Sequence, residues 1–220
     1  MKIHNLTEKP SILNTFISEL RDASIQKDRM RFRKNIERIG EIFSYELSKS
    51  LAFERKVVTT PLGNHASELP QNNIVICSIL RAGLPLHIGL LNYFDRADSA
   101  FISAYRKHNQ DQPSTFKIKV EYLACPNLNG KTLILADPML ATGQSIISVL
   151  KALEPYGMPE EIHLVSIIGA LPGVTYISEQ LPQNVHLWIG AIDKELNNRS
   201  YIVPGLGDAG DLSFGEKLQQ

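Results

Sequence analysis

The sequence predicts a single α/β domain, residues 1–220, built on an open and mostly parallel β-sheet with helices on both faces. Three observations support this prediction: nearly all-apolar runs of strand length, segments of helical periodicity between them, and a length of 220 residues. Apolar runs are typical of strands covered on both faces. Their alternation with helices is typical of parallel sheets, and a chain of this length suits one domain.

The expected elements follow in chain order. The first 55 residues are predicted to form a helical arm, in which apolar residues recur at spacings of three and four along 29–51: Phe32, Ile36, Ile39, Phe43 and Leu47. A short strand is expected at 56–63, stopped by Pro61. Further strands are predicted at 73–80, 99–105, 129–137, 161–170 and 184–193, and further helices at 83–94, 145–153 and 172–180.

Composition narrows the classes of function. The chain has 23 basic and 23 acidic residues, so its formal net charge is zero. The net charge therefore gives no indication of a nucleic-acid or membrane partner. Its two cysteines, Cys77 and Cys125, form neither a disulfide framework nor a zinc-binding spacing. No apolar run approaches the roughly 20 residues of a membrane span, and the first residues lack the pattern of a signal peptide. We therefore expect a cytoplasmic protein.

A lone carboxylate and a small polar turn follow the apolar run 132–136. Asp137 ends the run, and the turn Ala141–Ser145 opens a helix. A helix N-terminus offers unpaired N–H groups and a partial positive charge, and Gly143 lets an anion approach them. The pattern predicts a phosphate cradle beside a carboxylate that accepts hydrogen bonds from ribose hydroxyls. A simple helix cap after a strand end fits the same residues. The motifs of P-loop hydrolases and dinucleotide-binding proteins are missing.

Three strings carry a resemblance to a known family. ADPMLATGQS, 136–145, resembles the phosphoribosyl pyrophosphate motif of phosphoribosyltransferases, in the Asp-Pro form of the uracil phosphoribosyltransferases. ILRAGL, 79–84, is similar to their pyrophosphate-binding loop, and YIVPGLGDAGD, 201–211, followed by Phe214-Gly215, to their uracil-recognition segment. The resemblance implies the type I phosphoribosyltransferase fold, with a small hood and mobile loop at 104–126 and a uracil-binding loop at 200–216. It also implies a homodimer or a larger homo-oligomer.

The resemblance implies transfer of a phosphoribosyl group from phosphoribosyl pyrophosphate to uracil, which gives UMP and diphosphate. Mg²⁺ would be bound mainly by substrate oxygens and water, with no dedicated protein ligand. Residues implied to bind phosphoribosyl pyrophosphate are Arg81, Ala82, Gly83, Arg106, Asp137, Pro138, Met139, Leu140, Ala141, Thr142, Gly143, Gln144, Ser145 and Asp208. Asp137, Arg106 and Asp208 are the implied catalytic residues. Asp137 would hold the ribose hydroxyls, Arg106 would reach the diphosphate when its loop closes, and Asp208 would face the substrate directly or through magnesium.

The residues implied to contact uracil are Ile202, Gly207, Asp208 and Ala209. Three glycines and a proline within 201–211 predict an irregular loop rather than a helix or strand. Main-chain groups fixed in such a loop would discriminate against cytosine, which has an amino donor where uracil has a carbonyl acceptor.

Simpler interpretations are a tight surface turn for this segment, a surface salt bridge for Arg81 and a solvated loop charge for Arg106.

The chain departs from the family pattern at several points. Gln144 stands where the family usually has Gly, and the lysine of the family's mobile loop is missing from EYLACPNL, 121–128, so that Lys117 or Lys119 would have to substitute. LPLHIG, 84–89, lacks the usual Gly-Met, and the usual Thr after Phe214-Gly215 is absent. These departures lie mainly in the pyrophosphate loop and the hood.

Two alternatives to a uracil phosphoribosyltransferase fit the sequence. One is a transferase for another nucleobase, which the base-binding string disfavours. The other is a non-catalytic nucleotide sensor that binds RNA or a protein, and RNA binding would require a basic face. For the enzyme, GTP is a candidate effector.

Overall fold

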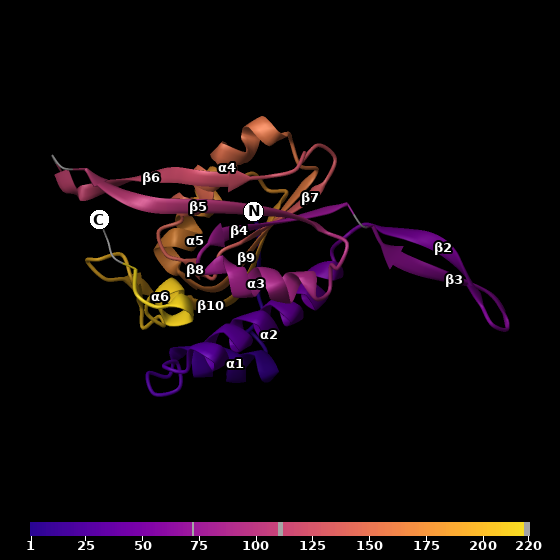
Figure 1. Cartoon of the computed structure of the whole chain (residues 1–220), viewed down its shortest axis with the longest axis horizontal. Helices are drawn as coiled ribbons and strands as arrows, with labels where there is room; N and C mark the ends of the chain where they lie inside the picture. The colour runs from indigo at the N-terminus through magenta and orange to yellow at the C-terminus, as the bar shows by residue number, and fades with distance from the viewer. Residues whose placement is uncertain (72, 110–111, 218–220) are drawn as a thin grey trace.

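The computed structural model describes residues 1–71, 73–109 and 112–217, and within 104–120 it describes the backbone alone. A mostly parallel sheet with helices on both faces forms its centre, which confirms the predicted fold class (Figure 1). The described strands of this sheet are β1 Lys2–Asn5, β4 Ile74–Leu80, β5 Asp98–Asn109, β6 Gln112–Ala124, β7 Thr132–Ala136, β8 Met139–Leu140, β9 Glu161–Ala170 and β10 Val185–Asp193. Their order is β1-β10-β9-β7-β4-β5-β6, with β8 paired to β9, and the β5–β6 pair is antiparallel.

Helices cover the sheet in two layers. On one face lie α1 Ile12–Arg21, α2 Arg29–Ser48 and α3 Gly83–Leu91, and on the other lie α4 Gln144–Leu153 and α5 Leu171–Gln180. Alternate residues of each central strand enter the two cores. In β4, Ile74 and Ile76 pack toward α1–α3, whereas Val75 and Cys77 pack toward α4 and α5. This two-sided burial explains why the strand reads as one continuous apolar run.

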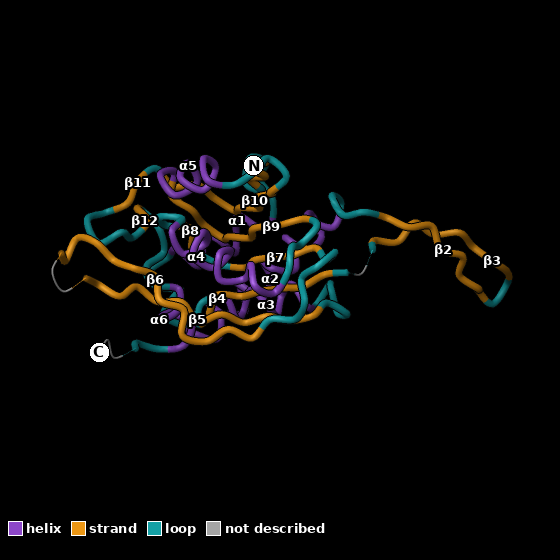
Figure 2. The backbone as a smooth tube through the Cα atoms, turned by 90° about the horizontal axis from the view of Figure 1, so that it is seen from above, coloured by secondary structure: helices purple, strands orange, loops and turns teal. Residues whose placement is uncertain are grey.

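The first 70 residues contain more strand than the sequence predicts. Residues 2–5 are not part of a helical arm but form β1, which pairs in parallel with β10 at the sheet edge. The strand expected at 56–63 is β2, Phe53–Thr60, and it forms an unpredicted hairpin with β3, Gly63–Pro70. The hairpin projects from the body of the molecule, at the end opposite the β5–β6 tip (Figures 1 and 2).

Two segments expected to be loops also contain regular structure. Most of 104–126 belongs to β5 and β6, whose backbones pair along their length. Within 201–211 the prediction of an irregular loop is wrong at both ends, because β12 Ile202–Val203 pairs with β11 Glu195–Leu196 and α6 begins at Ala209 and ends at Phe214. A short 3₁₀ helix, Glu154–Tyr156, follows α4. None of the helices formed by the described residues combines the length and the apolar character needed to cross a membrane.

Candidate active site

Two of the three motifs follow neighbouring parallel strands. Arg81 comes directly after β4 and Asp137 directly after β7, and these strands pair in register at Ser78 and Ala136. Because the carboxyl ends of parallel strands lie at one edge of the sheet, both motifs open onto that edge. Gly83 permits the close fit, since a Cβ atom there would lie 3.0 Å from the carbonyl oxygen of Ala136.

The turn that opens α4 forms a small hollow. Its lining residues are Asp137, Met139, Leu140, Ala141, Thr142, Gly143, Ser145 and Ile146, most of which the sequence predicts to bind one substrate. Gly143 is the N-cap of α4 and has a φ of +78°, which glycine adopts without steric strain. The N-terminal N–H groups of α4 lack partners within the helix, so the turn can bind an anion through its backbone.

Asp137 is held by its backbone at the mouth of this hollow. Its amide donates to the carbonyl oxygen of Val165, 3.0 Å away, and its own carbonyl accepts from the hydroxyl of Ser166 at 2.6 Å. One carboxylate oxygen lies 3.3 Å from the amide nitrogen of Met139. Val165 and Ser166 of β9 therefore fix the position of this residue relative to the turn.

Arg81 joins the first motif to the third. Its guanidinium donates to a carboxylate oxygen of Asp211 at 2.8 Å and to the carbonyl oxygen of Gly215 at 3.1 Å. The side chains of Arg81 and Asp211 are 41% and 29% exposed, so this is the surface salt bridge that the simpler interpretation of Arg81 describes. An exposed pair of this kind contributes at most about 1 kcal/mol, and an incoming anion can compete for the guanidinium.

The third motif has a buried part and an open part. Ile202 and Ala209 are buried, and Gly207 has a φ of +96°. The side chain of Asp208 caps α6, accepting from the amides of Gly210 at 2.8 Å and Asp211 at 3.0 Å. Because Ala209 is the first residue of α6, its N–H has no acceptor within the helix.

Comparison with known proteins identifies the family of this chain. A family model described as uracil phosphoribosyltransferase matches residues 7–216. The chain belongs to the uracil phosphoribosyltransferase family. The uracil phosphoribosyltransferase of Porphyromonas gingivalis is 50% identical over 218 residues, covering 99% of this chain and 100% of the relative. That of Pyrococcus furiosus is 36% identical over 220 residues, covering 99% and 91%. A solved structure of a protein from Aquifex aeolicus, 30% identical, aligns with a TM-score of 0.85 and covers 99% of this chain and all of its own.

For some predicted residues of this uracil phosphoribosyltransferase family member, the structure describes the backbone but not the side chain. The backbone of Arg106 lies in β5, opposite Ile118 of β6. Its side chain lies outside the described part of the structure, as do those of Lys117 and Lys119. The predicted catalytic role of Arg106, and the substitution of the missing lysine by either of these residues, therefore stay predictions.

Sequence reasoning also missed residues that shape the site of this uracil phosphoribosyltransferase family member. The turn around Gly143 packs on α5, where a Cβ atom at Gly173 would lie 2.0 Å from the carbonyl oxygen of Ala141. Buried His87 links the middle of α3 to the sheet, with Nδ1 2.8 Å from the Ser78 hydroxyl and Nε2 3.1 Å from that of Ser99. Burial lowers the pKa of His87 to about 4, so its ring is neutral at neutral pH. The sequence contains no motif for these contacts because each joins residues from separate elements.

Proposed function

We propose that this protein is a pentosyltransferase that makes UMP and diphosphate from uracil and phosphoribosyl pyrophosphate, a reaction of pyrimidine salvage. The observation that carries the proposal is the convergence of three motifs at one edge of the sheet. Two follow adjacent strands, and the ion pair between Arg81 and Asp211 brings the third against the first. The family to which the chain belongs takes its name from the same activity.

The ribose 5-phosphate part of the substrate occupies the hollow at α4 in this proposal. The backbone from Ala141 to Ser145 binds the 5-phosphate, with Gly143 allowing close approach and the hydroxyls of Thr142 and Ser145 adding contacts. Pro138, Met139 and Leu140 connect this cradle to Asp137. The Asp137 carboxylate binds the ribose hydroxyls and stabilises positive charge that develops on the ring as diphosphate leaves.

The leaving diphosphate lies at the turn of Arg81, Ala82 and Gly83, where Arg81 exchanges Asp211 for phosphate oxygens. Arg106 approaches from the β5–β6 strands. Mg²⁺ would be held mainly by oxygens of the bound diphosphate and ribose and by water. Carboxylate oxygens such as those of Asp137 and Asp208 suit this ion as additional ligands, and the ion supplies charge that neutralises the departing diphosphate.

The base is recognised by main-chain groups of the third motif. We propose that the free N–H of Ala209, together with backbone groups of Ile202 and Gly207, contacts the carbonyl and N–H groups of uracil. Asp208 holds the segment in shape by capping α6, as well as facing the phosphoribosyl side. A fixed backbone donor opposite the amino group of cytosine would be left unpaired, which gives the site its preference for uracil.

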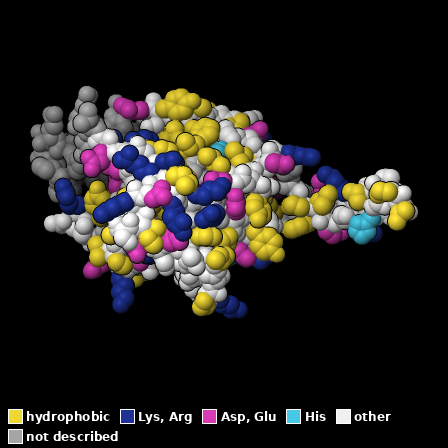
Figure 3. Space-filling view, turned by 60° about the horizontal axis from the view of Figure 1, so that its bottom comes forward, with side chains coloured by type: hydrophobic (Ala, Val, Ile, Leu, Met, Phe, Trp, Pro, Cys, Tyr) yellow, Lys and Arg dark blue, Asp and Glu magenta, His cyan; other side chains and the backbone are white. Residues whose placement is uncertain are grey.

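We also propose that the protein is a cytoplasmic homodimer in which the β2–β3 hairpin packs on a second copy of the chain. An isolated two-stranded hairpin is at best marginally stable in water. This hairpin exposes Val57 and Leu62, which are 67% and 99% accessible, and Figure 3 shows hydrophobic side chains along it. Burial of these side chains in a partner would stabilise both the hairpin and the dimer.

The dimer is tested by analytical ultracentrifugation of the Val57→Glu variant. We expect a dimer for the wild type and a shift toward monomer for the variant. Met158, which is 80% exposed outside the hairpin, provides the control, and Met158→Glu should remain dimeric. A wild-type monomer at micromolar concentration would contradict this part of the proposal. Whether GTP is an effector is tested by adding it to the wild-type protein in the ultracentrifuge and in the activity assay described next.

The activity is tested by measuring UMP formation from uracil and phosphoribosyl pyrophosphate with Mg²⁺. Asp137→Asn should lower kcat by roughly 100-fold, because it removes the charge opposite the developing cation. Asp98→Asn is the matched control: Asp98 pairs with Lys131 at the start of β5, away from the motifs, and loss of this carboxylate should leave kcat unchanged.

A folded wild type that binds both substrates without forming UMP, and shifts RNA in a salt-dependent manner, would favour the sensor. Basic and acidic side chains are interspersed on the face shown in Figure 3, which gives RNA no basic stripe there.

A further inference from the structure

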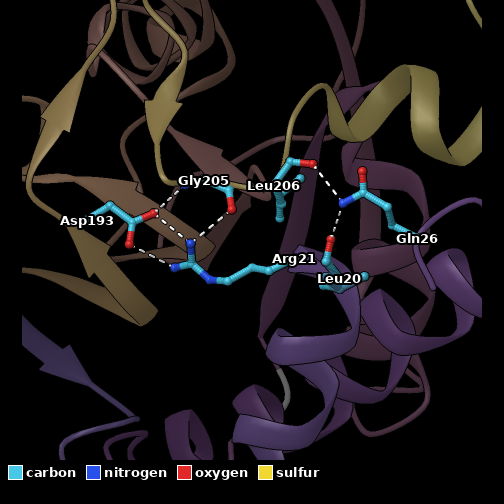
Figure 4. A network of polar contacts seen from close by, with 6 residues as sticks. All are labelled: Leu20, Arg21, Gln26, Asp193, Gly205 and Leu206. Atoms are coloured by element: carbon cyan, nitrogen blue, oxygen red, sulfur yellow. Dashed lines mark hydrogen bonds and ion pairs between the residues drawn. The ribbon is translucent and has the colours of Figure 1, made fainter. Parts of the chain in front are cut away.

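Two side chains from the N-terminal region, one at the end of α1 and one in the turn before α2, contact the backbone of the base-binding segment. Arg21, the last residue of α1, donates through Nη1 to the carbonyl oxygen of Gly205 at 3.0 Å. Gln26, in the turn before α2, donates through Nε2 to the carbonyl oxygen of Leu206 at 3.2 Å. Figure 4 shows both side chains pointing at consecutive residues of the segment. Residues nearly the whole chain length apart are thereby joined.

Arg21 acts together with Asp193 at the end of β10. The guanidinium binds both carboxylate oxygens, Nη1 to Oδ2 at 2.8 Å and Nη2 to Oδ1 at 2.9 Å. The same Oδ2 accepts the amide N–H of Gly205 at 3.0 Å. Both backbone groups of Gly205 are therefore held by one ion pair, whose side chains are only 23% and 10% exposed. Two-pronged, partly buried pairs of this kind fix geometry better than exposed single contacts do.

The segment is tight at this point and depends on such contacts. Gly205 has a φ of +60°, and a Cβ atom there would lie 2.1 Å from the carbonyl oxygen of Ile202. Gln26 uses its amide nitrogen twice, because Nε2 also donates to the carbonyl oxygen of Leu20 at 2.9 Å. The amide thus ties the end of α1 to Leu206, which is itself buried beside α1 in the core. Carbonyl groups lost from these bonds would have to find water or remain unpaired.

These contacts end immediately before the residues proposed to read the base. We propose that Arg21 and Gln26 are positioning residues that set the uracil specificity of the site, by fixing residues 205 and 206 and so aiming the backbone of Gly207 and Ala209. This inference rests on the proposed function. It assigns part of the base specificity to α1 and to the turn between α1 and α2, which carry no residue proposed to touch the base. A displacement of about 1 Å at a positioning group can change a rate about 100-fold.

The test compares Arg21→Met with Arg31→Met in the full-length protein. Arg31 makes a similar two-pronged bond, to Glu19 at 2.9 and 2.6 Å, which joins α2 to α1, and no bond from Arg31 to the segment is found among the described residues. We expect Arg21→Met to raise KM for uracil about tenfold and to reduce the preference for uracil over cytosine. KM for phosphoribosyl pyrophosphate should stay within about twofold, and Arg31→Met should change neither constant. Arg21→Lys, which keeps the charge but not the fork, should fall between wild type and Arg21→Met.

Gln26→Leu provides a second variant in case Arg21→Met does not fold. It should raise KM for uracil in the same way, and should speed hydrogen exchange at the amide of Gly205 or its neighbours. Unchanged uracil KM in both variants, with thermal stability lowered as in Arg31→Met, would show that the contacts are only structural. An inactive wild type would refute the proposed function and this inference with it. An active wild type with unaltered uracil KM in the variants would refute the inference alone.

Discussion

Replacement of Gly173 by alanine should damage the phosphate cradle without changing any residue of it. Gly173 lies in the first turn of α5, and its Cβ position is 2.0 Å from the carbonyl oxygen of Ala141 and 3.3 Å from the amide nitrogen of Gly143. A carbon atom and a carbonyl oxygen require a separation of at least about 3 Å, so the turn or the helix must move by about 1 Å. Such a shift should lower kcat/KM for phosphoribosyl pyrophosphate about 100-fold, equivalent to about 2.7 kcal/mol.

Stability and activity should separate in this variant. Alanine in a helix is favoured over glycine by about 1 kcal/mol, whereas overpacking costs about 1–3 kcal/mol, so the free energy of unfolding should fall by no more than about 2 kcal/mol. Gly89→Ala is the control, since its Cβ would lie 2.1 Å from the carbonyl oxygen of Glu37, between α3 and α2. It should lose a similar amount of stability, because the clash is similar, and keep its kcat/KM for phosphoribosyl pyrophosphate. Steady-state kinetics with urea unfolding measures both quantities, and unchanged kcat/KM in Gly173→Ala would refute the reasoning.

Two further predictions concern buried titratable groups. The pKa of His87 is lowered by burial from 6.5 to about 4, so between these values the unfolded chain binds a proton that the folded chain does not. The contribution of neutral His87 to the free energy of unfolding is therefore complete above pH 6.5 and falls by roughly 3 kcal/mol toward pH 4. Urea unfolding across this range should show a shallower fall in stability for His87→Gln than for the wild type. Parallel stability curves for the two proteins would contradict the assignment. Burial raises the pKa of Cys77 to about 12, and the thiol is fully buried. A thiol reagent should therefore modify the half-buried Cys125 first and Cys77 only on unfolding; equal native rates would count against this.

The central part of the fold could be predicted because burial leaves a clear local pattern. Strands covered on both faces need apolar residues at nearly every position, and β4 and β9 therefore stand out in the sequence. The placement of Arg81 and Asp137 at one edge follows from the rule for parallel strands. The joining of Arg81 to Asp211, by contrast, depends on how α6 folds back, and no local signal specifies it.

Elements outside the centre could not be predicted for several physical reasons. β3, Gly63–Pro70, begins with glycine, ends with proline and contains the charged Glu68, and it forms a strand because β2 pairs with it rather than because of burial. β1 is four residues long and gains its order from the edge of β10. The start of α6 follows two closely spaced glycines, Gly205 and Gly207, but the Asp208 side chain accepts from two of the helix's unpaired N–H groups. Nothing in the local sequence distinguishes Gly173 from other helical glycines, because its role depends on the contact between α5 and the turn at Ala141.

The position of Gln144 shows why one departure from the family pattern does not disturb the proposed cradle. In the turn Thr142–Gly143–Gln144 only Gly143 has a positive φ, +78°, and a Cβ atom there would lie 2.6 Å from the Ile177 side chain. Gln144 is the first residue of α4, its backbone is helical, and its side chain is exposed. A phosphate bound by backbone N–H groups needs only the amide of residue 144, which a glutamine supplies as well as a glycine does. The conformational requirement of this cradle therefore lies at Gly143 and, through packing, at Gly173 on α5, rather than along the whole glycine-containing string.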